Sequence, residues 1–254
     1  YGDFAGYSLI AIGAARVIGF RLMDNFRRPY LAASMGELWR RWHISLMSWF
    51  RDYLYAPLGG GKKGKVRGMI NILIIFTVSG LWHGAAWTFV LFGFLHGLFL
   101  VVGRQLQPWR NRQWARLETP EASGGKAALP PVLRTLRRLL GIGFTFFLWL
   151  LASPFFRATS FENALLHLKR MFVWPDDVTT GLMVPGIDRV DLLLMIGFIG
   201  VFFAVDVLEE RGKSLDARLA ALPLVPRWGM YLLISLVLLL FGSYGEVPFV
   251  YFQF

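Results

Sequence analysis

Long apolar runs, separated by short polar segments, dominate the hydrophobic pattern of this 254-residue chain. About 20 apolar residues cross the hydrocarbon core as a helix. We therefore expect membrane-spanning helices in the runs at residues 69–102, 139–155, 192–208 and 228–242. A shorter stretch at 7–20 contains Arg16 and is interpreted either as a span or as a partly buried helix. The pattern predicts an all-α, polytopic helical membrane protein, since a helix satisfies its own backbone polar groups in lipid.

The run at 69–102 is too long for one straight crossing. As a single helix it would measure about 50 Å, against about 30 Å of hydrocarbon core. His83 lies inside it between Gly80 and Gly84, so we expect the helix to break there. Two crossings of about 16 residues each would be shorter than an ordinary span.

Residues 36–55 follow a different pattern, which we interpret as one amphipathic helix. At about 100° per residue, one face is apolar and carries Trp39, Trp42, Leu46, Trp49, Phe50 and Tyr53. The other face carries Glu37, Arg40, Arg41, Ser48, Arg51 and Asp52. An aromatic amphipathic helix of this kind is typical of the membrane interface. His43 falls on the apolar face, where an ionisable ring should point into protein rather than lipid.

The segment at 104–138 is basic and contains several glycines and prolines, so we expect a flexible basic loop. It holds eight Lys or Arg residues and two acids, which places it on the cytoplasmic side by the positive-inside rule. Because successive spans cross the membrane in opposite directions, residues 157–189 should then lie outside the cytoplasm and residues 209–227 inside it. Within the outer segment, an amphipathic stretch covers 161–172.

Composition agrees with a membrane protein. Hydrophobic residues make up 56% of the chain and charged residues only 17%, whereas about 25% of a soluble domain is charged. The net charge of +11 does not indicate nucleic acid as a partner, because the basic residues lie between apolar runs. There they set orientation and contact anionic lipid headgroups. The absence of cysteine excludes disulfides, thiolate nucleophiles and thiolate metal sites.

His83 is the strongest candidate for chemistry. An ionisable group at membrane depth is costly and is usually functional, although a hydrogen bond to a neighbouring helix is the competing interpretation. The flanking glycines allow a substrate or another backbone to approach the ring. A neutral imidazole is suited to removing the proton of a hydroxyl that attacks a thioester. No serine lies in a Gly-x-Ser-x-Gly elbow, so direct transfer assisted by His83 is the simplest scheme.

The other histidines are weaker candidates. His43 is either a second proton-handling or substrate-positioning group or an interfacial histidine packed among tryptophans. We expect His96 to be a packed helix histidine and His167 to be structural. None of the four has the spacing of a zinc site, so we expect no metal.

Several charged and aromatic residues are candidates for binding substrate or donor. Arg40, Arg41, Arg51 and Asp52 either form the solvated face of the interfacial helix or meet the phosphates of an acyl-CoA or the phosphopantetheine of a carrier protein. Trp42 and Trp82, beside the two histidines, complete the set. The glycine-rich turn at 59–65 resembles a phosphate loop, but Val66 stands where Ser or Thr must hold magnesium, which argues against nucleotide hydrolysis.

Five motifs closely resemble those of the membrane-bound O-acyltransferase family. They are WRRWHISL at 39–46, WFRDYLY at 49–55, PLGG at 57–60, GLWHGA at 80–85 and FVYFQF at 249–254. The branch that the chain looks most like contains the alginate O-acetylation membrane protein, and the D-alanyl transfer protein of teichoic acid synthesis is a more distant relative. Members often have Ser where this chain has Ala5 and an acidic residue where it has Leu9.

The resemblance implies a helical fold with a funnel or tunnel through the membrane. It implies that His83 is the catalytic histidine, that His43 is the second histidine, and that 1–254 is the C-terminal part of one transmembrane domain whose N-terminal spans are missing. It also implies a bacterial inner-membrane enzyme that passes acetyl from a cytoplasmic donor to an exported polysaccharide, completed by a periplasmic acetyltransferase partner. The donor, acetyl-CoA or an acyl carrier, is a substrate, and we expect no bound cofactor.

The residues by themselves are also compatible with two other functions, a transporter and a non-catalytic scaffold. A transporter also has broken helices with polar residues at mid-depth, and it should tolerate His83→Gln. A non-catalytic scaffold that recruits a periplasmic enzyme should keep its activity after loss of both histidines.

Overall fold

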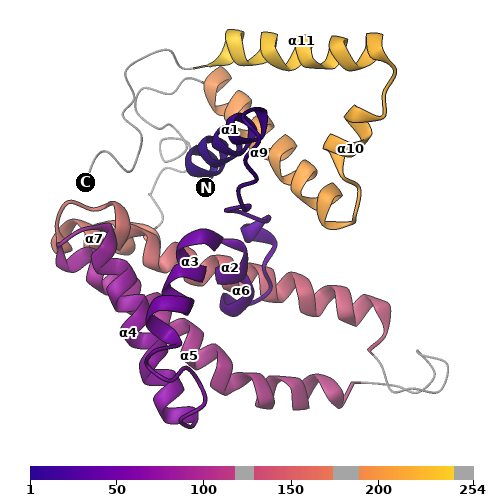
Figure 1. Cartoon of the computed structure of the whole chain (residues 1–254). Coiled ribbons are helices and arrows are strands. Elements are labelled where there is room, and N and C mark those ends of the chain that lie inside the picture. Colours follow the sequence, from indigo (N-terminus) through magenta and orange to yellow (C-terminus); the bar gives the residue numbers. More distant parts are fainter. Residues whose placement is uncertain (118–128, 174–188, 243–254) are drawn as a thin grey trace. The chain divides into compact units, whose positions relative to one another are not determined.

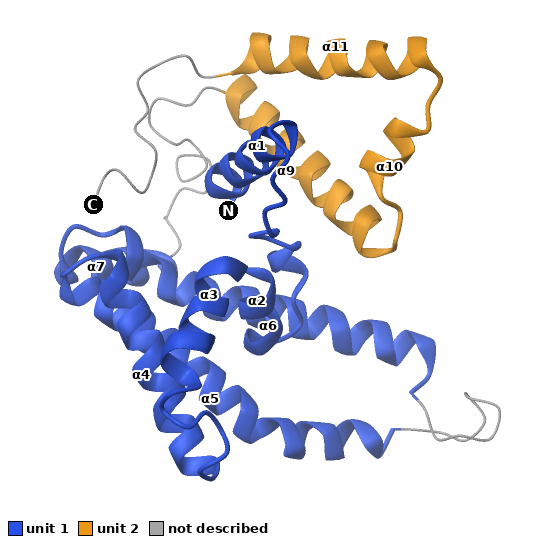
Figure 2. Ribbon diagram, in the orientation of Figure 1, with its two compact units in different colours: residues 1–174 blue, residues 175–254 orange. Residues whose placement is uncertain are grey.

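The computed structural model describes residues 1–117, 129–173 and 189–242, and the regular secondary structure in these ranges is entirely helical (Figure 1). Packing divides the chain into two compact units, Tyr1–Trp174 and Pro175–Phe254 (Figure 2). The predicted class, a helical membrane protein with interfacial and broken helices, is confirmed. The assignment of 1–254 to a single transmembrane domain stays a prediction.

The first unit contains the candidate site. Its described helices are α1 (Gly2–Val17), α2 (Met35–Arg41), α3 (Ile44–Phe50), α4 (Lys65–His83), α5 (Trp87–Ala115), α6 (Pro131–Arg157) and α7 (Phe161–Arg170). A 3₁₀ turn, η1 (Pro29–Leu31), precedes α2, and a π turn, η2 (Arg51–Tyr55), follows α3. The second unit contains α9 (Arg189–Glu210), α10 (Leu215–Ala220) and α11 (Leu224–Phe241).

Among the described helices, α4, α5, α6, α9 and α11 are long and apolar enough to cross a membrane. The run at 69–102 is divided between α4 and α5 at the predicted break beside His83. Its two crossings are longer than expected, because α4 begins at Lys65 and α5 continues to Ala115. The 19 residues of α4 alone extend about 28 Å, close to the thickness of the hydrocarbon core.

The basic loop expected at 104–138 is shorter than predicted. Helix α5 continues to Ala115 and α6 already begins at Pro131, a residue whose fixed φ suits the first helical position. The basic residues at each end of the segment are compatible with helix, since Arg and Lys are good helix formers. Pro120, Gly124 and Gly125, which predicted the loop, lie in 118–128, outside the described residues.

The single amphipathic helix expected at 36–55 is wrong, because the chain breaks at His43 between α2 and α3. The segment before η1 takes over backbone hydrogen bonds at this break. The amide of Arg27 donates to the carbonyl of Arg41 over 2.9 Å, and the amide of Ile44 donates to the carbonyl of Asn25 over 2.9 Å. A tertiary contact has therefore replaced local helical bonding.

Helices α4 and α5 form a close antiparallel hairpin built on glycines. A Cβ atom on Gly80 would overlap the carbonyl of Phe89, and one on Gly93 would overlap the carbonyl of Phe76. Small residues let two membrane helices approach until their backbones touch. The described core continues from this hairpin onto α2 and includes Met35, Leu38, Ile72, Phe76 and Leu100.

Candidate functional site

His83 is the last residue of α4 and lies at the turn into α5. Its half-buried ring contacts aromatic side chains from three helices. The ring centroid lies 4.9 Å from that of Trp82 on α4, 6.4 Å from Phe92 on α5 and 5.0 Å from Phe156 on α6. The end of one helix thus presents an imidazole to a largely apolar, aromatic environment.

The glycines that flank His83 have a packing role in this structure. Gly80 meets the backbone of α5 at Phe89 and Gly93, and a Cβ on Gly84 would lie 2.6 Å from Cε2 of Phe89. From the sequence, these glycines could admit either a substrate or another backbone. At Gly80 the structure shows the second case, the close approach of the α5 backbone. The tight turn that results fixes His83 at the start of the connection between the two helices.

His43 lies at the break between α2 and α3. Its backbone is in the left-handed region, with φ 43° and ψ 54°, which few non-glycine residues adopt. The side chain is 7% exposed and packs edge to face on Phe4, with centroids 4.8 Å apart. Burial lowers the pKa of His43 to about 4, so the ring is neutral at pH 7.

Asn25 holds the beginning of α3 in place behind His43. Its side-chain oxygen accepts hydrogen bonds from the amide of Ser45 at 3.2 Å and from the hydroxyl of Ser45 at 2.6 Å. Its amide nitrogen donates to the hydroxyl of Ser8 on α1 at 3.3 Å. These bonds, with the backbone bond from Ile44, support the unusual conformation of His43.

Trp82 brings the two predicted catalytic residues together. Its ring centroid lies 6.0 Å from that of His43 and 4.9 Å from that of His83. The side chain is 53% exposed, so about half of its surface is open to solvent, lipid or ligand. Phe4 and Phe156, which also contact these histidines, could not be predicted as site residues, because nothing in their local sequence distinguishes them from other apolar residues.

Trp42 belongs to a neighbouring aromatic cluster. Its ring centroid lies 4.3 Å from Trp149 on α6, 5.2 Å from Phe26 and 6.1 Å from Tyr30. The contacts attach α2 to α6 and to the segment before η1. Its proposed role in substrate binding stays a prediction.

The charged residues of the predicted interfacial helix have different surroundings. Arg41 forms a 2.6 Å ion pair with Glu37 and donates to the backbone carbonyls of Arg27 and Arg28. Arg51 binds Asp52 through two hydrogen bonds of 2.7 and 3.1 Å on the surface. These bonds to Arg51 lower the pKa of Asp52.

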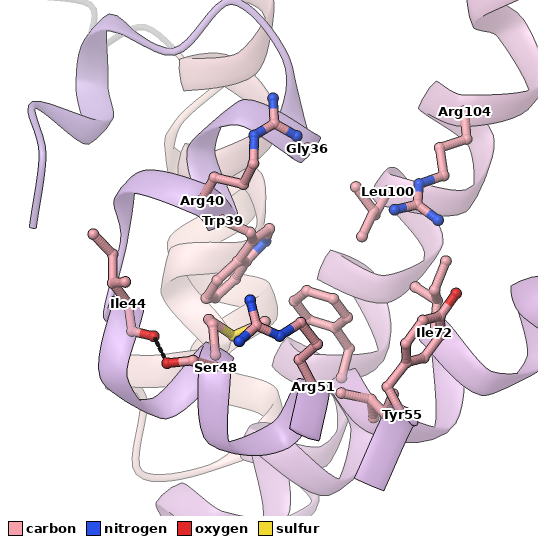
Figure 3. Close-up of a pocket in the computed structure, with 13 residues that line it drawn as sticks. Gly36, Trp39, Arg40, Ile44, Ser48, Arg51, Tyr55, Ile72, Leu100 and Arg104 are labelled. Carbon is pink, nitrogen blue, oxygen red and sulfur yellow. Dashed lines mark hydrogen bonds between the residues drawn. The ribbon is translucent and has the colours of Figure 1, made fainter. Parts of the chain in front are cut away.

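A cavity of about 350 Å³ opens between α2 and α3 on one side and α4 and α5 on the other (Figure 3). Arg40, Arg51 and Arg104 line it together with apolar side chains, and neither His43 nor His83 is among its lining residues. Arg41 and Asp52 are also absent from the lining. Arg104 was not identified from the sequence, where it marks only the end of an apolar run.

The remaining histidines lie outside this arrangement. His96 is completely buried, with ring centroids 4.5 Å from Phe92 and 5.1 Å from both Trp39 and Trp149. The prediction of a packed helix histidine is confirmed. His167 is exposed on α7. Within the described residues, no three His, Cys, Asp or Glu side chains are grouped as metal ligands.

Comparison with known proteins supplies the context for this geometry. A protein of Azotobacter vinelandii described as a probable alginate O-acetylase is 39% identical over 176 residues, which cover 69% of this chain and 31% of the relative. The peptidoglycan O-acetyltransferase of Helicobacter pylori is 36% identical over 171 residues, which cover 67% of this chain and 29% of the relative. The teichoic acid D-alanyltransferase of Streptococcus thermophilus is 32% identical over 177 residues, which cover 66% of this chain and 40% of the relative.

The chain spans roughly a third of the length of these curated relatives. The sequence profile of the membrane-bound O-acyltransferase family matches residues 1–149, more than half of the chain. This region includes α1 to α5, the break at His43 and the hairpin turn at His83. The chain therefore belongs to the membrane-bound O-acyltransferase family.

Proposed function

We propose that this protein is an O-acyltransferase of the bacterial inner membrane, which passes acetyl from a cytoplasmic donor towards hydroxyls of an exported polysaccharide. The observation that carries the proposal is the placement of His83 at the turn between two membrane helices, beside an exposed indole that also contacts His43. The relatives support the reaction class, since their names describe transfer of acetyl or D-alanyl groups to cell-surface polymers.

In this proposal His83 is the general base. Its neutral imidazole accepts the proton of the acceptor hydroxyl while the oxygen forms a bond to the carbonyl carbon of the donor thioester. The carbon–sulfur bond then breaks, and the imidazolium returns the proton to the departing thiolate. No cysteine is present to form an acyl-enzyme through a thiolate, so direct transfer is the simplest sequence of steps.

His43 has a positioning role in the same scheme. At neutral pH its ring is uncharged and can donate one hydrogen bond and accept another. Such a group can orient a substrate carbonyl or hydroxyl next to Trp82 without adding a second positive charge beside the imidazolium of His83. Trp82 would form a wall of the substrate site.

The substrates and partners follow from the reaction class. The donor is a thioester, either acetyl-CoA or an acyl carrier protein, and we propose no resident cofactor. Transfer across the bilayer would deliver the acetyl group to a periplasmic acetyltransferase partner, which completes esterification of the polymer. The five apolar helices support a multi-pass position in the membrane.

The proposal is tested in cells that express the protein as their source of acetylated polymer. Ester-linked acetyl on the exported polysaccharide is measured for the wild type, His83→Ala, His43→Ala and the exposed control His167→Ala at matched membrane expression. We expect His83→Ala to lose acetylation, with a decrease of at least about 100-fold, the contribution of general base catalysis. His43→Ala should lose part of it, and His167→Ala should retain it.

Wild-type acetylation in the His83→Ala variant would overturn the role of this histidine. Flux of substrate across the membrane without acyl transfer would instead favour a transporter. Retained recruitment of a periplasmic enzyme together with retained activity after loss of both histidines would favour a scaffold.

A further inference from the structure

The cavity between α2 and α3 and the α4–α5 hairpin is lined by neither of the two histidines. Its apolar lining includes Met47, Ile72, Ile75, Phe76 and Leu100. Most of these residues belong to α4 and α5, which are long and apolar enough to cross the bilayer. Its polar lining includes three arginines contributed by three elements of the chain, α2, η2 and α5.

The three arginines differ in how their charge is compensated. Arg51 binds Asp52 with two hydrogen bonds. Arg40 and Arg104 form no ion pair with any of the described residues. Figure 3 shows these two side chains on opposite sides of the pocket. Two uncompensated guanidinium groups that line a shared cavity favour an anion there.

The shape of the cavity restricts the kind of anion. Guanidinium groups match the geometry of phosphate oxygens and can bind them through paired hydrogen bonds. The apolar lining would remain exposed to water around a free inorganic anion, whereas an attached chain would cover it. The cavity therefore suits a ligand with a charged phosphate at one end and an apolar or weakly polar chain at the other.

We infer that this pocket binds a phosphate ester joined to such a chain, with Arg40 and Arg104 as its anion ligands and Arg51 as a third contact. Arg41 is not part of the site, because it is bound to Glu37 and does not line the cavity. Two sources provide this chemistry: an anionic phospholipid, which reaches the apolar lining from the bilayer, and a soluble coenzyme A thioester. Binding at this site does not depend on the proposed role of His83.

The experiment measures binding rather than turnover, with the protein reconstituted in phosphatidylcholine nanodiscs. One arm adds a labelled phosphatidylglycerol, and the second adds labelled acetyl-CoA. Both arms compare the wild type with Arg40→Gln, Arg104→Gln and the double variant. Arg112→Gln, which removes an exposed charge from the same helix and lies outside the cavity, is the matched control.

A second variant fills the cavity without changing its charge. A Cβ on Gly36 would lie 3.5 Å from Leu100 Cδ1 and 3.6 Å from Arg40 Nη1, so a larger side chain there projects into the lining. Gly36→Leu should therefore reduce binding even though all three arginines remain. Its monodispersity and unfolding midpoint are compared with those of the wild type to confirm that it folds.

We expect each arginine variant to weaken binding of one probe by about tenfold, the loss of one hydrogen bond to a charged group. Loss in the phosphatidylglycerol arm identifies a lipid site, and loss in the acetyl-CoA arm identifies a donor site. The inference is overturned if the double variant and Gly36→Leu bind both probes as the wild type does, or if Arg112→Gln weakens binding equally. A failed acetylation test at His83 would leave either binding result intact.

Discussion

His43 combines a left-handed backbone with a buried neutral ring, and both properties depend on its neighbours. The positive φ is unfavourable for a residue with a Cβ atom, so the surrounding contacts must compensate for it. Asn25 supplies hydrogen bonds to the next turn, and Phe4 covers the ring. The residue that we propose to position the substrate is itself positioned by side chains from α1 and from the segment before η1.

Replacing Asn25 by Ala should release the beginning of α3. The amide and hydroxyl of Ser45 would lose their acceptor, which costs about 1–3 kcal/mol of unfolding free energy. Unfolding in nanodiscs can be followed by tryptophan fluorescence, since the chain has ten tryptophans. Asn25→Asp keeps both acceptor interactions and should restore most of the stability; equal losses in the two variants would contradict this role.

The depressed pKa of His43 predicts that stability decreases in acid. The unfolded imidazole binds a proton near pH 6.5, but the folded one does so only near pH 4. Below pH 6.5 the unfolded chain therefore holds more protons, and the free energy of unfolding falls as the pH decreases towards 4. Between pH 7 and pH 5 the contribution is about 2 kcal/mol.

The pH effect is isolated by comparing His43→Gln with the wild type. The difference in unfolding free energy between pH 7 and pH 5 should be smaller in His43→Gln by about 2 kcal/mol. An identical pH dependence in both proteins would show that His43 is solvated or already protonated in the folded state.

At the scale of elements, the α4–α5 hairpin determines where His83 lies. The two helices approach closely because Gly80 and Gly93 face each other across the contact, and the connection between the helices is only Gly84 to Ala86. The turn is so short that a displacement of one helix along the other would move His83 directly. Packing of the hairpin and geometry of the site are therefore coupled.

Gly93→Ala should separate these helices. The new Cβ would overlap the backbone carbonyl of Phe76, which cannot rotate away as a flexible side chain would. We expect a loss of about 3 kcal/mol, typical of severe overpacking, or failure to accumulate in membranes. Gly103→Ala is the control on the same helix, since a Cβ there meets nothing within 4 Å; it should be neutral or stabilising by up to about 1 kcal/mol.

At the scale of the whole molecule, apolar surface is distributed unevenly among the spanning helices. About a third of the apolar window of α4 and of α5 is buried, compared with 6% for α9 and 0% for α11. In a membrane protein this apolar surface is covered by lipid tails or by other parts of the same protein. The second unit thus derives little of its stability from packing within the described chain.

Lysine substitutions along α11 test whether this helix is embedded in lipid. Leu232→Lys, in the middle of the helix, should raise the apparent free energy of insertion by about 3 kcal/mol and so disfavour integration, whereas Leu224→Lys at its start should have little effect. Both leucines are more than 60% exposed, so the two variants should lose a similar amount of packing within the protein. Membrane integration is measured by glycosylation mapping, and equal integration of the two variants would argue against a buried span.

The sequence was sufficient to predict the helical class, the spans and the break beside His83, because these depend on local hydrophobicity and on the positions of glycines. It failed at residues 36–55, where the amphipathic period continues through a break. The hydrogen bonds that stabilise the break come from Asn25 and Arg27, earlier in the chain. The hydrophobic period of residues 36–55 cannot predict hydrogen bonds to residues elsewhere in the chain.

The hydrophobic pattern identified His83, since an ionisable residue in an apolar run is informative on its own, and it placed His43 on the apolar face of an amphipathic segment. Only the tertiary structure decided that one indole, Trp82, contacts both rings. It also decided that Arg40 shares a cavity with Arg104 while the adjacent Arg41 is bound to Glu37. Polarity and helix period are local properties of a sequence, whereas the meeting of side chains from separate helices is determined by packing.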